Sequence, residues 1–474
     1  MKSLYRIAAA LLAAPVAVAC LLVPTTAAAQ SQRALDARSE RAVKHWTPER
    51  RAAATPRDLV IDERGLGYIR ARGGQLIPHG HDVAPMAKPG GGGDSTGPSV
   101  TAMSPGAGAT IGASASFSAT VTDASGVKSV SIKVQQGSGR AQSFNASQGA
   151  NGTWSVNLSG FTNGSYSWWV VAQDNAKPSN STTTAAIPFS VDTSGGGGGE
   201  ETVPNAEWVN GGVVQMAVGR IYFEMPGNPR RTTWGGYVCS GTVTNDGTSG
   251  RTVIITAAHC VYDDANKAYA RNVLFIPDQA ETSGSGTDLN CGNDPIGCWA
   301  PDFGVVDVNW TTRTFPDNVA WDYAYYTVND TGAHSPGLTA AGSALDGAVT
   351  PMAVSFSAPS VGALTRALGY SYDVDPQFMY CADPVENFDA ANWWLPNCGL
   401  SGGSSGGPWS QPFNTGTGNG PIMSVNSWGY TGSPGMAGPK LSGTSAACVY
   451  ATAKSAPLGV SYLDGDAGVT VSCP

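Results

Sequence analysis

The chain has 474 residues, a length that predicts two or three domains. Asp and Glu together number 35 against 27 Lys and Arg, which gives a formal net charge of −8. This acidity argues against nucleic acid as the main partner, because a nucleic-acid-binding surface needs clustered positive charge. The cysteines form no CxxC pair with metal-ligand spacing, so we expect no zinc or other metal and no cofactor.

Residues 1–29 have the pattern of a secretory signal peptide. A basic start precedes an apolar stretch from Ile7 to Val23, and Ala27-Ala28-Ala29 offers small residues for cleavage. The apolar stretch is short and interrupted by prolines, which argues against stable membrane insertion. A lipoprotein signal ending at Cys20 is the alternative that the sequence leaves open. We expect a secreted, extracellular protein.

Residues 30–96 form a basic segment that ends in a glycine-rich linker, Gly90 to Gly93. Beyond a possible helix from Arg33 to Val43, the segment has no clear periodicity. Its place between a signal and the folded units predicts either the pro-segment of a zymogen or a disordered spacer. Its arginines could pair with the acidic domain that follows, although most charged runs are simply solvated.

Residues 97–193 alternate apolar and polar side chains with a period of two, as in short half-buried strands. One such face holds Val130, Ile132 and Val134, and another holds Trp168, Val170 and Ala172. Turn-forming residues separate the runs, which predicts an antiparallel β-sandwich. The segment resembles bacterial immunoglobulin-like domains, and it contains no cysteine. It is either a passive spacer or a module that binds a substrate or surface.

A second glycine-rich linker, 194–201, leads to residues 202–474, where short strands alternate with Gly, Pro and Asn turns. With Cys20 removed alongside the signal, all the remaining cysteines lie in this part of the chain. An even number of cysteines in an exported protein predicts a disulfide framework, although eight can pair in 105 ways. The eight residues are Cys239, Cys260, Cys291, Cys298, Cys381, Cys398, Cys448 and Cys473.

Two motifs in this last part carry the chemistry. Thr256-Ala257-Ala258-His259-Cys260 places a histidine after an apolar run, and Gly403-Ser404-Ser405-Gly406-Gly407-Pro408 places a serine among glycines. A serine needs a base to become a nucleophile, and histidine titrates near neutral pH. Asp322, just before a strand-like run, is the best candidate to orient the imidazole. Asp302, Asp307 and Asp317 are its rivals.

Together these motifs resemble the chymotrypsin-like (trypsin-fold) serine peptidases, over about residues 202–474. The chain order His259, Asp322, Ser405 is that of the family. The resemblance implies an all-β, two-barrel domain and an oxyanion hole made by the backbone N–H groups of Gly403 and Ser405. It also implies that Cys239 pairs with Cys260. Nearest-neighbour pairing of the other cysteines suggests 291–298, 381–398 and 448–473.

Ser427-Trp428-Gly429 resembles the family's substrate-binding segment, which pairs with the backbone of an extended peptide as an added strand. The family's pocket floor, six residues before the nucleophile, falls on uncharged Gly399, so no preference for lysine or arginine is expected. Asn426 stands where glutamyl-specific relatives have histidine, and Lys440 could reach the pocket from the far side. Ser404 precedes the nucleophile in place of aspartate, which makes trypsin's activation switch doubtful.

These patterns predict a secreted, monomeric serine endopeptidase that cleaves protein or peptide substrates through an acyl-enzyme. The alternative is a non-catalytic exported binding or adhesion protein on a peptidase-like fold. A subtilisin-like interpretation is weaker. It would use Ser445 with His79 or His81 and Asp192, but these residues follow one another in the wrong order along the chain.

Overall fold

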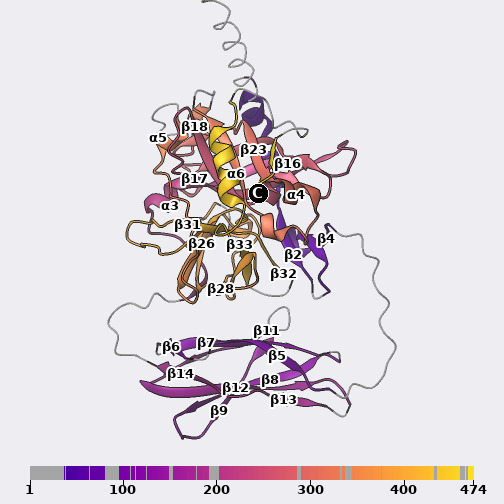
Figure 1. Ribbon diagram of the computed structural model, residues 1–474, viewed down its shortest axis with the longest axis vertical. Coiled ribbons are helices and arrows are strands. Elements are labelled where there is room, and N and C mark those ends of the chain that lie inside the picture. Colours follow the sequence, from indigo (N-terminus) through magenta and orange to yellow (C-terminus); the bar gives the residue numbers. More distant parts are fainter. Residues whose placement is uncertain are drawn as a thin grey trace, which may run out of the picture.

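The computed structural model describes residues 37–80, 96–191 and 202–473, apart from short gaps. The gaps are 38, 63, 107, 113, 124, 149–152, 178, 285–289, 331–333, 337–343, 375, 432–434, 459–464 and 466–467. The expected signal peptide, 1–29, lies outside the described residues, as do both glycine-rich linkers. Figure 1 shows a chain built mostly from β-strands, with few short helices.

Residues 99–191 form two facing sheets that make a β-sandwich (Figure 1). The first sheet has the order β10 (Ser147–Gln148), β11 (Thr153–Ser159), β7 (Ser114–Thr122) and β5 (Ser99–Ser104). The second has the order β6 (Ala109–Ile111), β14 (Ile187–Val191), β12 (Gly164–Asp174), β8 (Val127–Gln136) and β9 (Gln142–Asn145), with β13 (Ser181–Thr183) also beside β12.

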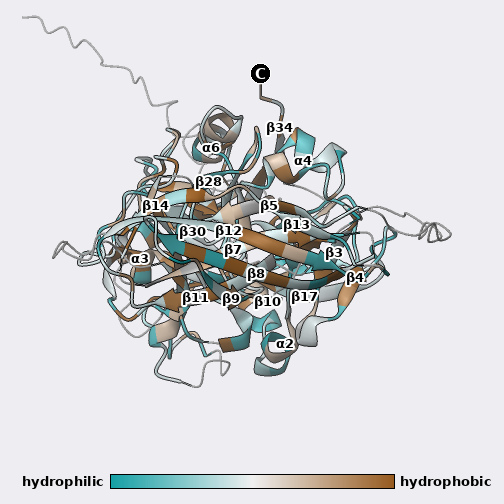
Figure 2. Ribbon diagram, turned by 90° about the horizontal axis from the view of Figure 1, so that it is seen from below, coloured by the Kyte–Doolittle hydropathy of each residue, from teal (hydrophilic) through white to brown (hydrophobic). Residues whose placement is uncertain are grey.

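The alternating pattern explains the core of this sandwich. Trp168, Val170 and Ala172 of β12 are fully buried, and antiparallel pairing sets Trp168 opposite Val134 and Val170 opposite Ile132 of β8. Phe117 packs edge-on against Trp168 and joins the two sheets. Figure 2 shows the apolar and polar residues alternating along these strands. The predicted sandwich strands are therefore confirmed.

The largest sheet of the remaining chain has eight strands and carries the histidine motif. β18 (Arg251–Thr256) pairs with β24 (Ala324–Asn329) on one side and with β17 (Trp234–Thr244) on the other. Nearly all the residues of β18 and β24, and most of those of β17, are buried, as the continuous apolar runs predict. Its other strands are β16 (Val218–Pro226), β21 (Arg271–Pro277), β23 (Phe303–Asp307), β34 (Val469–Val471) and β1 (Thr55–Pro56).

Two further sheets carry the serine motif and the segment after it. The five-stranded sheet has the order β15 (Val203–Glu207), β27 (Met379–Pro384), β26 (Leu364–Gly369), β30 (Pro408–Ser410) and β31 (Ile422–Val425). The seven-stranded sheet has the order β28 (Glu386–Asn387), β29 (Asn392–Leu395), β33 (Met436–Pro439), β32 (Trp428–Tyr430), β2 (Asp58–Ile61), β3 (Gly67–Arg70) and β4 (Leu76–Pro78). No sheet of the described residues closes into a barrel, so the expected two-barrel architecture is not shown and the fold is mostly β with several sheets.

The remaining elements are short and connect or cover the sheets. α6 packs Ala446, Val449 and Ala453 into the core beside β23 and β24. No helix in the described part of the chain is long and apolar enough to span a membrane. These elements are α2 (Pro48–Ala53), α3 (Gly212–Ala217), α4 (Val308–Thr312), α5 (Leu345–Ala348), α6 (Ala446–Ser455), η1 (Arg72–Gly74), η2 (Ala258–Cys260), η3 (Gln279–Glu281), η4 (Val319–Trp321), η5 (Tyr372–Val374) and the short pairs β19 (Tyr262–Asp263) with β20 (Ala268–Tyr269) and β22 (Gly297–Cys298) with β25 (Ser335–Pro336).

Residues 37–80 of the basic segment fold onto the larger unit, which is the part of the chain formed by residues 202–473. The disordered-spacer interpretation is therefore wrong for residues 37–80. Residues 39–45 are helical, which bears on the expected helix only in part because 33–36 and 38 are outside the described residues. Trp46 is buried and its indole N–H donates to the backbone oxygen of Asn272 at 2.5 Å. The short strands of this segment, β1 to β4, have no clear alternation of apolar and polar residues, so the sequence did not predict them. β1 and β2 pair with strands far along the chain, which a local pattern does not reveal.

Four disulfides staple the larger unit, and they are the four expected pairs. Three close loops of 17 to 25 residues, and the pair Cys291–Cys298 closes a loop of 7. Closing such loops stabilises a fold mainly by restricting the unfolded chain. The other pairs are Cys239–Cys260, Cys381–Cys398 and Cys448–Cys473.

Candidate active site

Strand pairing brings the histidine and aspartate motifs together. β18 ends at Thr256 and antiparallel β24 begins opposite it at Ala324, so both loops leave the same edge of the sheet. His259 follows β18 in a 3₁₀ turn, and Asp322 ends the turn before β24. Both side chains are fully buried. Residues 63 positions apart in sequence therefore meet at one place.

His259 and Asp322 share two hydrogen bonds. Nδ1 of the imidazole lies 2.7 Å from Oδ2 of Asp322, and the backbone N–H of His259 donates to Oδ1 at 2.8 Å. This arrangement keeps the Nδ1 proton on the aspartate side and directs Nε2 away from it. Among the rival aspartates, Asp307 instead caps α4 and accepts a hydrogen bond from Ser445. Asp322 is thus the carboxylate that the structure joins to His259.

Ser405 lies in a tight turn that only glycines allow. Gly403 and Gly406 have φ of +98° and +81°, the left-handed region that disfavours other residues. Space is equally restricted, since a Cβ on Gly406 would lie 2.4 Å from the backbone oxygen of Ser240. Ser405 itself is 5% exposed. The glycine run therefore holds one serine hydroxyl against the histidine sheet.

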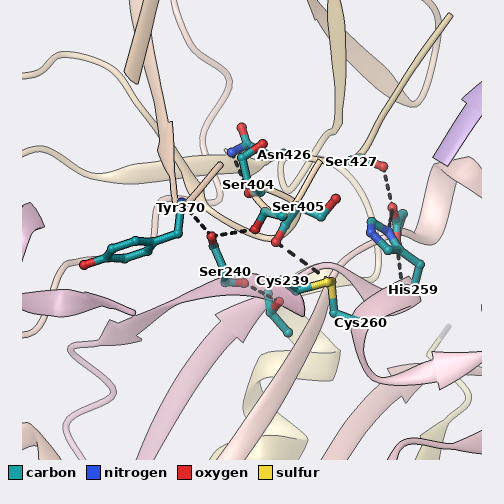
Figure 3. The surroundings of a disulfide bond; sticks show 12 residues. Cys239, Ser240, His259, Cys260, Tyr370, Ser404, Ser405, Asn426 and Ser427 are labelled. Atoms are coloured by element: carbon teal, nitrogen blue, oxygen red, sulfur yellow. Dashed lines mark hydrogen bonds and ion pairs between the residues drawn. A yellow bond between two sulfur atoms is a disulfide. The ribbon is translucent and has the colours of Figure 1, made fainter. Parts of the chain in front are cut away.

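Ser240 and the neighbouring disulfide tie this turn to the histidine loop (Figure 3). The N–H of Ser240 donates to the backbone oxygen of Ser405 at 2.7 Å, and its hydroxyl donates to that of Gly403 at 2.9 Å. Cys239, one residue earlier, is joined to Cys260, which follows His259. Figure 3 shows Ser405 beside His259 as a result. The sequence gave no sign of the role of Ser240, because that role depends on contacts across the chain.

Asn426 is a second support that sequence reasoning missed. Its amide nitrogen donates at 2.8 Å to the backbone oxygens of Leu368 and Ser404, and its oxygen accepts from the indole of Trp409 at 2.7 Å. This buried side chain therefore links the residue before Ser405 to β26 and to Trp409 of β30. The sequence suggested that Asn426 lies at the specificity pocket, but in the structure its side chain is bonded to Leu368, Ser404 and Trp409.

Three polar groups at the site lack partners among the described residues. Nε2 of His259 is buried without a hydrogen bond. The backbone N–H groups of Gly403 and Ser405 likewise donate to no acceptor within the described chain. Buried donors and acceptors are normally satisfied, so such groups mark places where a ligand or reacting atom would bind. One imidazole nitrogen and two backbone N–H groups without partners therefore lie at the same place in the fold.

The segment Ser427-Trp428-Gly429 lies beside the site, but its first residue has a different contact from the one expected. The hydroxyl of Ser427 donates to Oδ2 of Asp322, the oxygen that also faces His259. Trp428 and Gly429 begin β32, which pairs with β33 on one side and with β2 on the other. The edge predicted to bind a peptide backbone is therefore already paired.

Gly399, at the predicted floor of the specificity pocket, carries no charge. The N–H of Gly399 donates to the backbone oxygen of Pro204 at 2.7 Å. Lys440 lies over the ring of Trp393, and its ammonium group donates at 2.6 Å to Asn387 and to the backbone of Asp389. Lys440 is thus engaged at the surface, and the structure gives no support to its reaching into the pocket.

The other singled-out residues that the structure describes do not gather into a second site. Ser445 contacts Tyr323 and Asp307, whereas His79 contacts Asp264, and the remaining subtilisin-like positions lie outside the described residues. The sulfurs of Cys239 and Cys260 lie near His259, as a metal site would require. Because the two sulfurs form a disulfide, they offer no thiolate to a metal.

Comparison with known proteins gives a family to the sandwich alone. Residues 98–170 match the family described as a bacterial Ig domain. A solved structure, the fibronectin(III)-like modules of CbhA from Clostridium thermocellum, has 22% sequence identity and a TM-score of 0.16, covering 20% of this chain and 94% of its own. No curated protein sequence matches the chain. The four disulfides and the Ig-like domain are consistent with an extracellular protein.

Proposed function

We propose that the chain is a secreted serine endopeptidase in which Ser405 is the nucleophile, His259 the general base and Asp322 the orienting carboxylate. The observation that carries the proposal is the contact of Asp322 with both Nδ1 and the backbone of His259, while Nε2 is left unpaired near Ser405. A histidine held in this tautomer can accept a proton only at Nε2.

The reaction follows from these positions. Nε2 takes the Ser405 proton as Oγ attacks the scissile carbonyl carbon, and the carbonyl π electrons become an oxyanion. The N–H groups of Gly403 and Ser405 would donate to that oxyanion. The tetrahedral intermediate collapses when the imidazolium protonates the leaving amine, which leaves an acyl-enzyme. Water, deprotonated by His259, then repeats the steps and releases the acid.

A chymotrypsin-like, two-barrel architecture belongs to the same proposal. The histidine and aspartate loops leave one sheet, whereas Ser405 and Ser427 belong to the loops of the two other sheets. A site where loops of different sheets meet, with chain order His, Asp, Ser, supports that family. The protein or peptide substrates and the monomeric state stand on the same resemblance.

Labelling with a small alkyl fluorophosphonate tests the proposal directly. We expect covalent modification of Ser405, located by mass spectrometry, and none in folded His259→Ala or Ser405→Ala protein. Incubation must be long, because Ser405 is only 5% exposed. No adduct on Ser405 under conditions that label a known serine peptidase would reject the proposal and favour the non-catalytic binding protein.

A further inference from the structure

Residues 55–61 connect the two sheets between which the candidate site lies. Thr55 and Pro56 pair in parallel with Tyr237 and Val238 of β17, just before Cys239 and Ser240. A few residues later β2 pairs in parallel with β32, with Leu59 opposite Trp428. The chain therefore passes from the histidine half to the serine half at Arg57 and Asp58.

The passage lies directly against the glycine run. A Cβ built on Gly402 would lie 2.7 Å from Cβ of Pro56 and 2.8 Å from Cβ of Asp58, which leaves no room for a side chain. Burial raises the pKa of Asp58 to about 6, and Arg70 and His259 are near enough for their charges to oppose that rise. The three atoms nearest to that Cβ position are side-chain carbons of Pro56 and Asp58. The segment therefore covers the turn before Ser405 with side chains, and no backbone carbonyl of the segment is among these nearest atoms.

The same segment fills the edge that a substrate backbone would need. Leu59, Val60 and Ile61 are 0%, 1% and 8% exposed, and the backbone oxygen of Ile61 accepts from the N–H of Thr431 at 3.0 Å. Arg70 adds a hydrogen bond at 3.0 Å to the backbone oxygen of Tyr430. A peptide that binds by strand addition needs those backbone groups, so it and β2 exclude each other.

Arg57 fastens the passage from the histidine side. Its guanidinium is 1% exposed and lies 3.3 Å from Oδ2 of Asp263 and 3.9 Å from Oδ1 of Asp264. His79 approaches the same Asp264 oxygen at 2.9 Å. Burial opposes ionisation of Asp264, but its contacts with His79 and Arg57 outweigh burial and keep its pKa below the ordinary value. Removing Arg57 would leave a buried carboxylate without its counter-charge.

We propose that residues 55–61 are an intramolecular inhibitor that covers the catalytic groove, closed by Arg57 on Asp263 and Asp264 and by β2 on β32. This inference rests on the proposed function and specifies how the site is regulated. The full chain is then latent. Activity requires that the segment leave the β32 edge. Correct placement of Ser405 beside His259 is not sufficient while the segment stays there.

Two substitutions in the full chain test the proposal from opposite sides. Gly402→Ala adds a methyl group where Pro56 and Asp58 lie, and φ of Gly402 is outside the left-handed region, so the backbone accepts alanine. Arg57→Ala removes the buried cation. Arg64→Ala is the matched control, because that exposed arginine lies just after the segment and its hydrogen bonds among the described residues go to Asp62 and Tyr68.

Two measurements follow the segment. Hydrogen exchange at the Thr431 amide and along β32 reports β2 pairing without any catalysis. The rate of Ser405 modification by a tripeptidyl phosphonate, which needs the β32 edge, reports access to the site. Relative to wild type and Arg64→Ala, both rates should rise at least about tenfold in Gly402→Ala and in Arg57→Ala, since each change disrupts a packed or paired contact.

The outcomes separate the two proposals. Slow exchange at Thr431 in Gly402→Ala, or phosphonate rates equal to wild type in both variants, would overturn the inhibitory role. The comparison of phosphonate rates applies only where Ser405 is modified at a measurable rate; faster exchange at Thr431 with no modification of any protein, wild type included, would support displacement of β2 but reject Ser405 as a nucleophile. If Arg57→Ala does not fold, the decision rests on Gly402→Ala, whose change leaves every ion pair intact.

Discussion

The hydroxyl of Ser427 and the carboxylate of Asp322 are joined by a hydrogen bond on the oxygen that also faces Nδ1 of His259. Ser427 and His259 thus share one oxygen of Asp322, and the Ser427 hydroxyl helps to fix the orientation of that carboxylate. A residue expected to bind substrate is also a positioning residue for the histidine.

Ser427→Ala should therefore lower the rate of acylation. Loss of one hydrogen bond to a buried carboxylate costs on the order of 1–3 kcal/mol, so we expect kcat about tenfold lower with a smaller change in KM. The assay uses a peptide substrate in the Gly402→Ala background. Ser410→Ala, which removes another buried hydroxyl bonded only to the backbone of Pro421, should leave kcat unchanged. Equal kcat values for the two variants would contradict the positioning role.

Ser405→Ala should abolish fluorophosphonate labelling and, in the Gly402→Ala background, reduce turnover by on the order of 10⁴, the scale known for Ser-His-Asp triads. The neighbouring Ser404→Ala is the control, since that hydroxyl donates to the backbone of Ser401 rather than facing His259. Ser404→Ala should label within a few-fold of wild type. Near-normal turnover by folded Ser405→Ala is the result that the triad does not allow.

Asn426→Asp should destabilise the protein and the loop before Ser405. The substitution replaces the two N–H donors with an oxygen facing the backbone oxygens of Leu368 and Ser404, a loss of about 1–3 kcal/mol or more. We expect a lower melting temperature by scanning calorimetry and slower labelling of Ser405. Asn414→Asp keeps the acceptor that its exposed turn uses, and it should melt as wild type does.

Asp278 should make stability fall as the pH rises. Burial raises its pKa from 3.8 to about 7, although Gln215 donates a hydrogen bond to it. The folded state therefore holds a proton that the unfolded chain releases, and stability is lost between about pH 4 and 7. Asp278→Asn should remove this loss and stabilise the protein at pH 8 by on the order of 1–3 kcal/mol.

Urea denaturation at pH 4 and pH 8 measures the effect. The difference between Asp278→Asn and wild type should be small at pH 4 and large at pH 8. Glu40→Gln, at an exposed position, serves as the control for removing one negative charge. The same shift in that control would mean that overall charge, rather than Asp278, sets the pH dependence.

Cleavage specificity should not favour lysine or arginine. Gly399 supplies no carboxylate, and burying a substrate cation without a counter-charge costs several kcal/mol. Since Lys440 is engaged with Asn387 and Asp389, a preference for acidic side chains is not expected either. Profiling the Gly402→Ala protein on a mixed peptide library should find cuts after small, aromatic or aliphatic residues. A dominant cut after arginine would show that Gly399 is not the pocket floor.

Local patterns in the sequence predicted those features that are encoded locally. The period-two alternation around Val130 and Trp168 located the sandwich strands. Nearest-neighbour spacing of the cysteines gave three disulfides, and the family resemblance implied the fourth, Cys239–Cys260. The motif around His259 and the order of Asp322 after it were enough to predict their meeting. The catalytic roles of these residues, and the two-barrel architecture, stay predictions.

Contacts between distant segments were not predictable in the same way. Leu59 pairs with Trp428, 369 residues later, through a strand of four residues that has no alternation. The sequence left open whether the arginines of the basic segment are solvated or pair with the domain that follows; Arg57 pairs with Asp263 and Asp264 and is among the most buried side chains of the described residues. Ser240 and Asn426 have ordinary sequence surroundings, and only the fold shows which backbone oxygens they contact.

Leu59 and Ile61 belong to the same apolar core as Val253 of β18 and Tyr325 of β24. The loops that carry His259 and Asp322 adjoin these two strands. Burial of those side chains is part of the free energy that drives the chain to collapse. Under the proposed inhibitory role, folding and the pairing of β2 with β32 are a single event, and a newly made molecule would reach its native state without activity. The order of synthesis reinforces this, because residues 55–61 leave the ribosome long before the sheets they will cover. A cell that exports the protein would be shielded from its activity until the segment is displaced outside.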